Sequence, residues 1–276
     1  MLAQDYKKVI LKKNAPDITT CYSQRKYNGM RCIIDKNGMW SRKGKPIVSC
    51  PHIIEALQSS FEKNPDLILD GELYNDLYAD NFEELISVFR QTKPTTEDLE
   101  KSKQFGQFFV YDMPSDDGSF GVRFNELGYF VGKLSSPYVI LVPTALIKSQ
   151  EHCDELYALY LSEGYEGQII RQDLPYENKR TNSLLKRKEF MDAEFELIDL
   201  VEGLGNWAGK AKSALLKLPD GRTFNAGITG TMEFTANLLK NKHKYIGKKT
   251  TVNFFQYTSD KVPLFPRCKE FDRVDV

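Results

Sequence analysis

The sequence has few cysteines, and none of them is paired in a spacing that binds metal or forms a redox motif. There are 5 cysteines in 276 residues, an odd number, and no two stand in Cys-x-x-Cys spacing. These features exclude a dense disulfide framework and a zinc ribbon, and they are typical of a reducing, intracellular setting. The histidines His52, His152 and His243 form no local cluster.

Long apolar runs and an excess of charge of one sign are also missing. No segment approaches the roughly 20 apolar residues that span a bilayer, and MLAQDYKKVILKK at the start lacks a signal-peptide core. We therefore expect an intracellular protein with no membrane association. The 38 basic and 38 acidic residues balance, unlike many nucleic-acid binders, which are basic overall. This balance does not exclude nucleic acid, because binding depends on where the charges lie.

The residues that are present predict a globular α+β fold over the first two thirds of the chain. Hydrophobic residues make up 41% of the sequence, which is enough for a large core. A hairpin is predicted around Asn37-Gly38, and helices are predicted to start at Pro51 and near Asn81 and to cover 151–163. Buried strands are predicted at 66–74, 107–113, 167–172 and 183–190. Because strands and helices do not alternate strictly, we expect mainly antiparallel sheets.

The pattern changes after about residue 190. Short strands separated by turn signals, such as Pro219-Asp220-Gly221, surround one short helix over 231–243. Several strands with one helix in about 80 residues fit a small β-barrel such as an OB-fold. The sequence therefore predicts two domains, 1–189 and 190–276.

Polar residues interrupt several of the predicted strands in a fixed order. By itself, the segment Lys26-Tyr27-Asn28-Gly29-Met30-Arg31 has the composition of an ordinary polar turn. It is followed by further segments that place carboxylates and cations at strand edges. They are Ser41–Pro46 (SRKGKP), Asp70–Tyr74 (DGELY), Phe108–Asp112 (FFVYD), Glu166–Arg171 (EGQIIR) and Leu184–Lys188 (LLKRK).

This ordered set resembles motifs I, Ia, III, IIIa, IV and V of the covalent nucleotidyltransferases, which are ATP-dependent DNA ligases, RNA ligases and mRNA capping enzymes. The strands after residue 190 and the segment Val262–Pro266 are most similar to the OB domain of a DNA ligase. The chain as a whole resembles the minimal two-domain ligase of large DNA viruses and phages. The resemblance implies a nucleotidyltransferase (adenylation) domain followed by an OB-fold domain.

The resemblance implies a role for each motif residue. Lys26 would be the catalytic nucleophile that forms a covalent lysyl-AMP with ATP. Glu72 and Glu166 would hold Mg²⁺, and Tyr111 would stack on adenine. The implied nucleotide-binding residues are Arg31, Glu72, Tyr111, Glu166, Lys186 and Lys188.

Other implied roles concern the DNA ends. Arg31 and Arg42 are expected to bind the 5′-phosphate of a nick, since guanidinium groups match phosphate oxygens. Asn28 is expected to position the 3′-hydroxyl. The family usually has aspartate at the position of Asn28 and arginine at the position of Leu264, so this chain departs from the pattern at both.

Nicked duplex DNA is the expected partner, bound by a monomer. The segments Lys179–Lys188 and Lys240–Lys249 each carry five cations, and contacts to phosphate are independent of sequence. Two alternatives share these features. One is an RNA ligase or a capping guanylyltransferase, and the other is an inactive clamp that binds DNA without catalysis.

Overall fold

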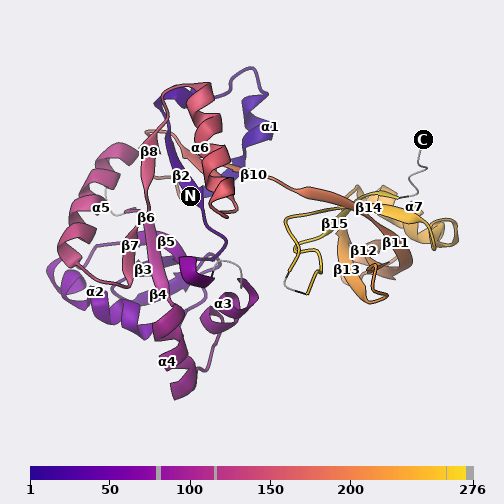
Figure 1. Cartoon of the computed structure of the whole chain (residues 1–276), viewed down its shortest axis with the longest axis horizontal. Helices are drawn as coiled ribbons and strands as arrows, with labels where there is room; N and C mark the ends of the chain where they lie inside the picture. Colours follow the sequence, from indigo (N-terminus) through magenta and orange to yellow (C-terminus); the bar gives the residue numbers. More distant parts are fainter. Residues whose placement is uncertain (79–81, 115–116, 259, 272–276) are drawn as a thin grey trace. The chain divides into compact units, whose positions relative to one another are not determined.

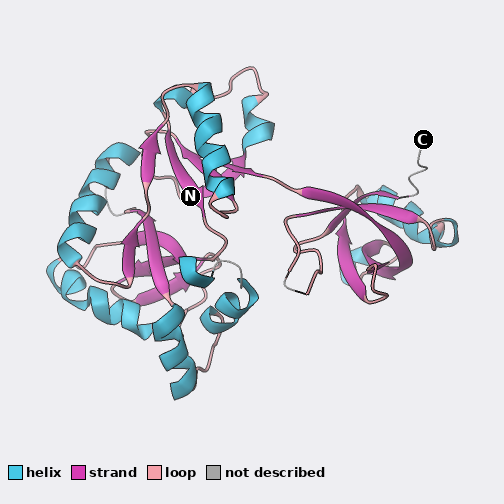
Figure 2. Ribbon diagram, in the orientation of Figure 1, coloured by secondary structure: helices cyan, strands magenta, loops and turns pink. Residues whose placement is uncertain are grey.

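The computed structural model describes residues 1–78, 82–114, 117–258 and 260–271. The chain divides into two compact units, Met1–Lys188 and Glu189–Val276. Helices cover sheets in the first unit, whereas the second is mostly strand (Figures 1 and 2). In the described part of the chain, no helix combines the length and apolar composition needed to cross a bilayer.

Sheet A of the first unit has the strand order β1-β10-β9-β2-β8 among the described residues. Its pairs are antiparallel except β1 with β10. Alternate side chains of a strand face opposite sides, and Ile170 and Leu185 pack in an apolar cluster with α1 and α6. The residues that precede and follow Ile170 and Leu185 on their strands therefore point to the other face of the sheet. The strands are β1 (Leu2–Asp5), β2 (Tyr22–Lys26), β8 (Thr144–Leu146), β9 (Gly167–Arg171) and β10 (Arg180–Lys188).

Sheet B has the order β4-β3-β5-β6-β7, with only β6 and β7 parallel among its described pairs. Ile34, Leu73 and Val110 on one face are fully buried against α2 and α5, which lie along the outside of the sheet in Figure 1. The strands are β3 (Met30–Asp35), β4 (Gly38–Ser41), β5 (Leu69–Tyr74), β6 (Gln107–Asp112) and β7 (Val139–Leu141).

The helices of the first unit follow recognisable signals. Pro51 occupies the first turn of α2, and Ile53, Leu57 and Phe61 form its buried stripe. Thr95 and Asp98 form a reciprocal capping box that starts α4. The helices are α1 (Tyr6–Ile10), α2 (Pro51–Lys63), α3 (Phe82–Phe89), α4 (Thr96–Phe105), α5 (Phe120–Leu134) and α6 (Gln150–Ser162), with short 3₁₀ turns η1 (Ile18–Thr20) and η2 (Asp76–Tyr78).

The predicted elements are present, with differences at their ends. The hairpin is confirmed, but Asp35 pairs with Gly38, so its turn is Lys36-Asn37 rather than Asn37-Gly38. Only Gly38 of the Asn-Gly pair has a positive φ, of 137°, so Asn37 does not supply the expected left-handed residue. Asn81 lies outside the described residues. Helix α6 is followed by Gly164 at φ 87°, as expected.

The second unit contains a closed barrel with the strand order β11-β12-β13-β15-β14. The helix α7 (Met232–Lys240) lies between β13 and β14. This is the topology of the predicted OB-fold, and its interior is filled by Leu197, Leu216 and Phe254. The strands are β11 (Met191–Glu202), β12 (Ala211–Lys217), β13 (Thr223–Ile228), β14 (Lys249–Phe254) and β15 (Arg267–Phe271), with η3 (Gly205–Trp207) and η4 (Lys242–Lys244).

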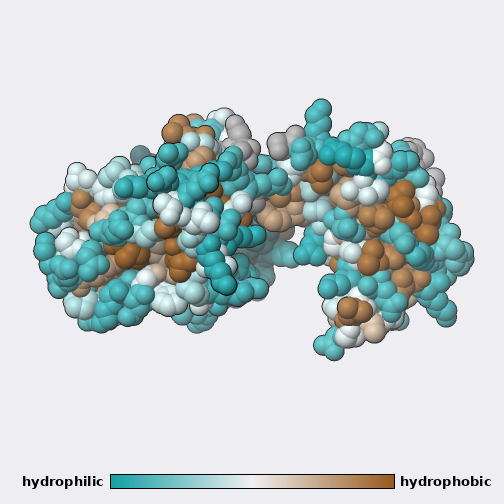
Figure 3. All heavy atoms as spheres, turned by 90° about the horizontal axis from the view of Figure 1, so that it is seen from below, coloured by the Kyte–Doolittle hydropathy of each residue, from teal (hydrophilic) through white to brown (hydrophobic). Residues whose placement is uncertain are grey.

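Apolar side chains are partly exposed on both units, whereas the cysteines are buried. In the view of Figure 3, apolar atoms reach the surface of both units in patches between hydrophilic side chains. All five cysteines are free and buried, which agrees with the expectation of no disulfide framework.

Candidate active site

The strand register of sheet A brings Lys26 and Lys188 into one row. Gly167 of β9 is the Cα partner of Lys26 on β2 and of Lys188 on β10. Gln24 and Lys186 stand two residues back along their strands and share the same face. The alternation of the strands therefore gathers basic side chains on the face that α1 and α6 do not cover.

Glu166 links the two lysines of this row. Its backbone N–H donates to the Lys26 carbonyl at 3.0 Å, and its carboxylate forms an ion pair with Lys26 Nζ. The other carboxylate oxygen accepts from Lys188 Nζ at 2.8 Å. Glu166 is almost fully buried, whereas the Lys26 side chain is 20% exposed, so Lys26 is accessible to a ligand.

Two glycines allow the chain to pass close to its neighbours at this point. Gly167 has φ of 147°, and a Cβ there would lie 2.2 Å from the Arg187 carbonyl oxygen. A Cβ on Gly29 would lie 2.3 Å from the carbonyl oxygen of Leu73. Both are backbone clashes, which explains the glycines that follow Glu166 and Asn28 in the sequence.

Sheet B contributes Arg31 and Glu72, which are Cα partners on β3 and β5. The Arg31 guanidinium forms a bidentate pair with Asp70, with Nε–Oδ1 at 2.9 Å and Nη2–Oδ2 at 2.8 Å. It also donates to the Met1 carbonyl at 2.6 Å and to the Tyr176 hydroxyl at 3.1 Å. Within the described ranges, four of its five N–H groups are therefore engaged, and one on Nη1 remains for another partner.

Tyr111 reaches the site through a β-bulge. Asp70 pairs with Asp112 and Gly71 pairs with Val110, so Tyr111 is the extra residue on β6. A bulge can turn two consecutive side chains toward one side of a sheet. Tyr111 and Asp112 both contact Arg171 of sheet A, by a ring contact and an ion pair.

These side chains surround a cavity of about 270 Å³ within the first unit. Seven of the nine predicted site residues line it. Glu166 lies behind the wall, bonded to Lys26 and Lys188. Asn28 does not line the cavity. The lining includes eight basic residues and two acidic ones, which are Arg25, Lys26, Arg31, Arg42, Arg171, Arg180, Lys186 and Lys188 with Asp70 and Glu72. This excess of positive charge suits a polyanionic ligand.

The two glutamates of the site have opposite electrostatic environments. Burial raises the pKa of Glu72 to about 8, outweighing the attraction of Lys26. Burial also acts to raise the pKa of Glu166, but Lys26 and Lys188 together outweigh it and hold the pKa below its usual value. Glu166 is thus a carboxylate fixed by two cations, whereas Glu72 has no ion pair among the residues that the structure describes.

Two of the predicted cations have no anionic partner within the described ranges. Lys186 and Arg42 both line the cavity, and neither forms an ion pair or side-chain hydrogen bond there. Burial, together with the charges of Lys188 and Lys26, lowers the pKa of Lys186. An approaching anion would relieve this repulsion.

The acidic residues fit a magnesium ion better than a metal bound by protein alone. No group of three or more His, Cys, Asp or Glu that could hold a metal occurs in the described part of the chain. Mg²⁺ typically takes one or two carboxylates and completes its shell with water and substrate phosphates. Glu72 lines the cavity without an ion pair among the described residues and could serve as such a ligand, whereas Glu166 would first have to release Lys26 or Lys188.

Sequence reasoning assigned no role to several residues that line the cavity. Gln24 stands two residues before Lys26, and Asp70 stands two before Glu72. The two-residue period of a strand could have placed both on the active face. Arg171 and Arg180 belong to segments with recognised motifs or charge, but their positions depend on the strand register, which the sequence does not state.

The basic segments Lys179–Lys188 and Lys240–Lys249 differ in which of their cations form ion pairs. In the first, Arg180 lines the cavity, while Arg187 pairs with Asp154 at 2.5 Å. In the second, Lys242 pairs with Asp199 and Lys249 lies 3.7 Å from Glu194. These pairs leave the second unit with fewer unneutralised cations than a count of its lysines indicates.

Residues 1–188 match the family model of the ATP dependent DNA ligase domain. The chain belongs to this family. The matched region coincides with the unit that contains the cavity and the Lys26 row, so the nucleotidyltransferase motifs and the fold agree.

Curated relatives of the chain are DNA ligases from viruses and bacteria. The DNA ligase of African swine fever virus (isolate Tick/South Africa/Pretoriuskop Pr4/1996) is 27% identical over 281 residues, covering 90% of this chain. The chain spans 62% of the length of that relative. The DNA ligase of Haemophilus influenzae is 24% identical over 183 residues, covering 66% of this chain and 63% of the relative.

Solved structures show the same fold over nearly the whole chain. A structure from a study of DNA binding by Lig E DNA ligases has a TM-score of 0.80 at 21% identity, covering 98% of both chains. The bacteriophage T7 ATP-dependent DNA ligase, solved in complex with ATP, has a TM-score of 0.52 at 18% identity and covers 98% of this chain and 97% of that one. These structures therefore share the fold of both units of this chain.

Proposed function

We propose that the chain is an ATP-dependent DNA ligase that seals nicks in duplex DNA through a lysyl-AMP intermediate. The observation that carries this proposal is the position of Lys26. Its amine lies in a strongly basic cavity, in one row with Lys188 and opposite Glu72 and Tyr111, within a domain of the DNA ligase family. This is the arrangement that covalent transfer of a nucleotide requires.

In the first step, Lys26 Nζ attacks the α-phosphorus of ATP. An N–P bond forms, the bond between the α- and β-phosphates breaks, and pyrophosphate leaves. The ammonium must first lose a proton, which solvent can accept because a fifth of the side chain is exposed (20%). The amine must also leave Glu166, whose second partner Lys188 keeps the carboxylate in place.

In the second and third steps, AMP passes to the DNA and is then displaced. An oxygen of the 5′-phosphate attacks the AMP phosphorus, and the N–P bond breaks to restore Lys26. The 3′-hydroxyl then attacks the activated 5′-phosphorus and releases AMP. Arg42 is free to hold the 5′-phosphate, and Arg31 can offer its remaining N–H. Asn28, although outside the cavity lining, remains our candidate for positioning the 3′-hydroxyl.

The remaining site residues bind the nucleotide. Tyr111 would stack on adenine, and Lys186 and Lys188 would contact the phosphates. Glu72 would accept a hydrogen bond from the ribose, and Glu72 with Glu166 would hold Mg²⁺. A bound Mg²⁺ would neutralise charge on the triphosphate. The second unit would bind the phosphate backbone of duplex DNA, and the enzyme would act as a monomer.

The decisive experiment is labelling with α-labelled nucleotide, read by the intact mass of the protein. We expect one AMP per chain from ATP and none in Lys26→Ala, with Lys36→Ala in the exposed hairpin turn as a matched control. A nicked duplex with DNA strands should then be sealed. Label from GTP would instead indicate a capping guanylyltransferase, and no label from either nucleotide would indicate an inactive clamp.

The polynucleotide preference needs a second assay. Sealing of a nick between DNA strands and of a nick between RNA strands should be compared at equal enzyme concentration. Sealing restricted to the RNA nick would replace our proposal by an RNA ligase. Sedimentation of the protein with and without nicked DNA would test the monomer.

A further inference from the structure

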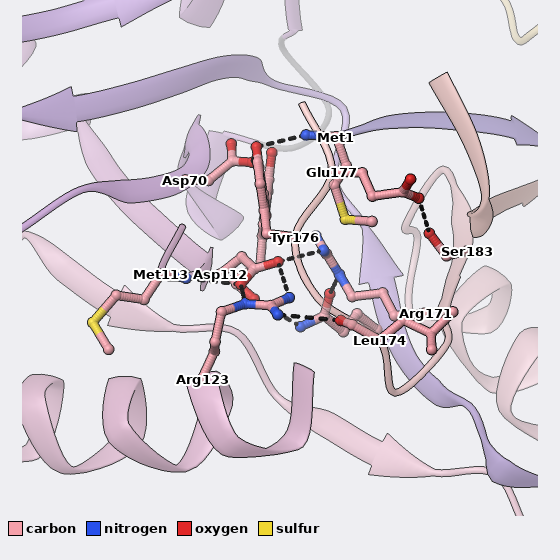
Figure 4. A network of polar contacts seen from close by, with 12 residues as sticks. Met1, Asp70, Asp112, Met113, Arg123, Arg171, Leu174, Tyr176, Glu177 and Ser183 are labelled. Carbon is pink, nitrogen blue, oxygen red and sulfur yellow. Dashed lines mark hydrogen bonds and ion pairs between the residues drawn. The ribbon is translucent and has the colours of Figure 1, made fainter. Parts of the chain in front are cut away.

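The end of the cavity away from Lys26 is closed by a buried ionic network. Arg171 on β9 and Arg123 on α5 both point at Asp112 on β6 (Figure 4). All three residues are almost fully buried, with exposures of 4%, 0% and 0%. The network joins sheet A, sheet B and α5 at one carboxylate.

Arg123 alone balances the charge of the carboxylate, because it pairs with both oxygens. Arg123 Nε lies 2.7 Å from Asp112 Oδ1, and its Nη2 lies 3.1 Å from Oδ2. Arg171 Nη1 adds a second contact to Oδ2 at 3.0 Å, and the Met113 N–H donates to Oδ1 at 2.9 Å. Two guanidinium groups thus share one negative charge, and a buried charge without its own partner is costly. Neutralising Asp112 does not explain why a second arginine is present.

Two other side-chain contacts of Arg171 are with residues of the cavity wall, whereas a third, with the Phe120 ring at 5.2 Å, lies outside the cavity lining and is shared with Arg123. Arg171 Cζ lies 4.9 Å from the centre of the Tyr111 ring, which is within the range of a cation–π interaction. Its Nε donates to Gln24 Oε1 at 2.7 Å. Gln24 and Tyr111 both line the cavity.

The contact with Gln24 fixes the orientation of that amide. Gln24 Nε2 donates to Thr144 Oγ1 at 2.9 Å, while Oε1 accepts from Arg171. A flipped amide would set its NH₂ group against the N–H of Arg171, so one orientation is strongly preferred. The carbonyl oxygen of the amide keeps a second lone pair for another donor.

Arg123 provides a natural comparison, because it shares Asp112 but not the cavity. Its Nη1 donates to the carbonyl oxygens of Gly118 at 2.6 Å and Leu174 at 3.2 Å. It contacts neither Tyr111 nor Gln24 by any hydrogen bond or ring interaction within the described residues. One arginine therefore supports the fold, and the other faces the site.

We propose that Arg171 is a positioning residue for the nucleotide base, one that holds the Tyr111 ring and the Gln24 amide in the geometry that receives adenine. This inference rests on the proposed function, because it needs a nucleotide in the cavity. Arg171 would affect the binding of the base, and the reaction at Lys26 would not depend on it.

The test compares Arg171→Met with Arg123→Met in lysyl-AMP formation. For Arg171→Met we expect the KM for ATP to rise by about tenfold, with kcat within about twofold. For Arg123→Met we expect a lower Tm and an unchanged KM for the folded fraction. A KM for Arg171→Met within twofold of wild type, or an equal rise in both variants, would overturn the proposal.

A second variant covers the case in which Arg171→Met does not fold. Arg171→Lys keeps a cation beside Asp112 but loses the planar contact with Tyr111 and the Nε donor to Gln24. We expect a stability closer to wild type than that of Arg171→Met, and a KM raised by about three- to tenfold. An unchanged KM in this folded variant also contradicts the inference.

Binding without chemistry separates this inference from the proposed function. ATP binding with Mg²⁺ is measured by calorimetry in the Lys26→Ala background, with and without Arg171→Met. A loss of affinity of about tenfold supports the inference even if wild type forms no lysyl-AMP. Equal affinities overturn the inference, while lysyl-AMP formed by wild type would still support the ligase.

Discussion

The two ends of the cavity are built in opposite ways. At the end that holds Lys26, Arg42 and Lys186 have no anionic partner within the described residues, and Glu72 is raised in pKa by burial. At the other end, Asp112 is fully buried and bound by both Arg123 and Arg171. The first end keeps charges available for a ligand, and the second uses them within the protein.

This difference indicates what a mutation at each end should change. An unpartnered surface charge contributes little to stability, whereas breaking a buried pair leaves an uncompensated charge. Substitutions near Lys26 should therefore reduce catalysis more than stability, and substitution of Asp112 or Arg123 should do the reverse.

The largest effect is expected from Asp112→Asn. This change removes the charge shared by two buried arginines while it keeps the shape of the side chain. We expect a loss of about 3–5 kcal/mol in unfolding free energy, measured by urea denaturation. Lysyl-AMP formation by the folded fraction should keep its kcat, and a variant as stable as wild type would remove the contrast between the two ends.

Glu166→Gln should have the next largest effect, but on rate. The amide cannot hold Lys26 and Lys188 by charge, so we expect lysyl-AMP formation to slow by about a hundredfold, or roughly 2.7 kcal/mol. Single-turnover labelling measures this rate. The matched control is Glu163→Gln, which alters an ion pair with Arg25 at the end of α6 and should leave the rate near that of wild type.

The raised pKa of Glu72 predicts that the stability of the metal-free protein depends on pH. Its folded pKa is about 8, against 4.5 for the ordinary group. Between these values the folded protein keeps a proton that the unfolded chain loses, so stability falls as pH rises through this window. The loss should be on the order of 2 kcal/mol, because water reaches the cavity wall.

Glu72→Gln should remove this slope. Urea denaturation with a chelator at pH 5 and pH 8.5 makes the measurement, and wild type should lose more stability than the variant between the two. Parallel pH profiles for the two proteins would show that Glu72 does not titrate in this range.

The smallest effect is expected from Arg42→Ala. Arg42 is exposed and lines the cavity without a partner among the residues that the structure describes, so its removal should change unfolding free energy by less than about 0.5 kcal/mol. Transfer of AMP to the 5′-phosphate should slow by about tenfold, measured by mixing preformed lysyl-AMP with nicked DNA. Lys43→Ala, at the neighbouring exposed turn position, is the control.

The sequence predicted the fold well where local patterns are strong. The apolar stripe after Pro51 and the apolar runs of β5 and β6 predicted the correct elements, and the strands after residue 190 predicted the correct barrel class. Helix α5 was missed, since its glycines and mixed polarity over Phe120–Leu134 weaken the helical pattern. Strand ends moved by up to three residues, because pairing partners decide where a strand begins.

The site was predictable in its residue types but not in its pairings. Lys26 and Glu166 were found from their motifs, yet their direct ion pair follows from the β2–β9 register. Arg31 was expected to be free for phosphate, whereas Asp70 and Tyr176 engage most of its donors. Tyr176 lies in a loop with no periodic signal, so only tertiary structure reveals this contact.

The bulge at Tyr111 limits how the length of β6 can vary. One extra residue is what allows Tyr111 and Asp112 to face sheet A together. Deleting Val110 would restore regular alternation and turn Tyr111 toward the apolar layer beneath α2 and α5, whereas deleting Tyr111 or Asp112 would remove one of the two side chains. The residue count of β6 is therefore fixed by the site that the strand serves, rather than by the stability of its own sheet.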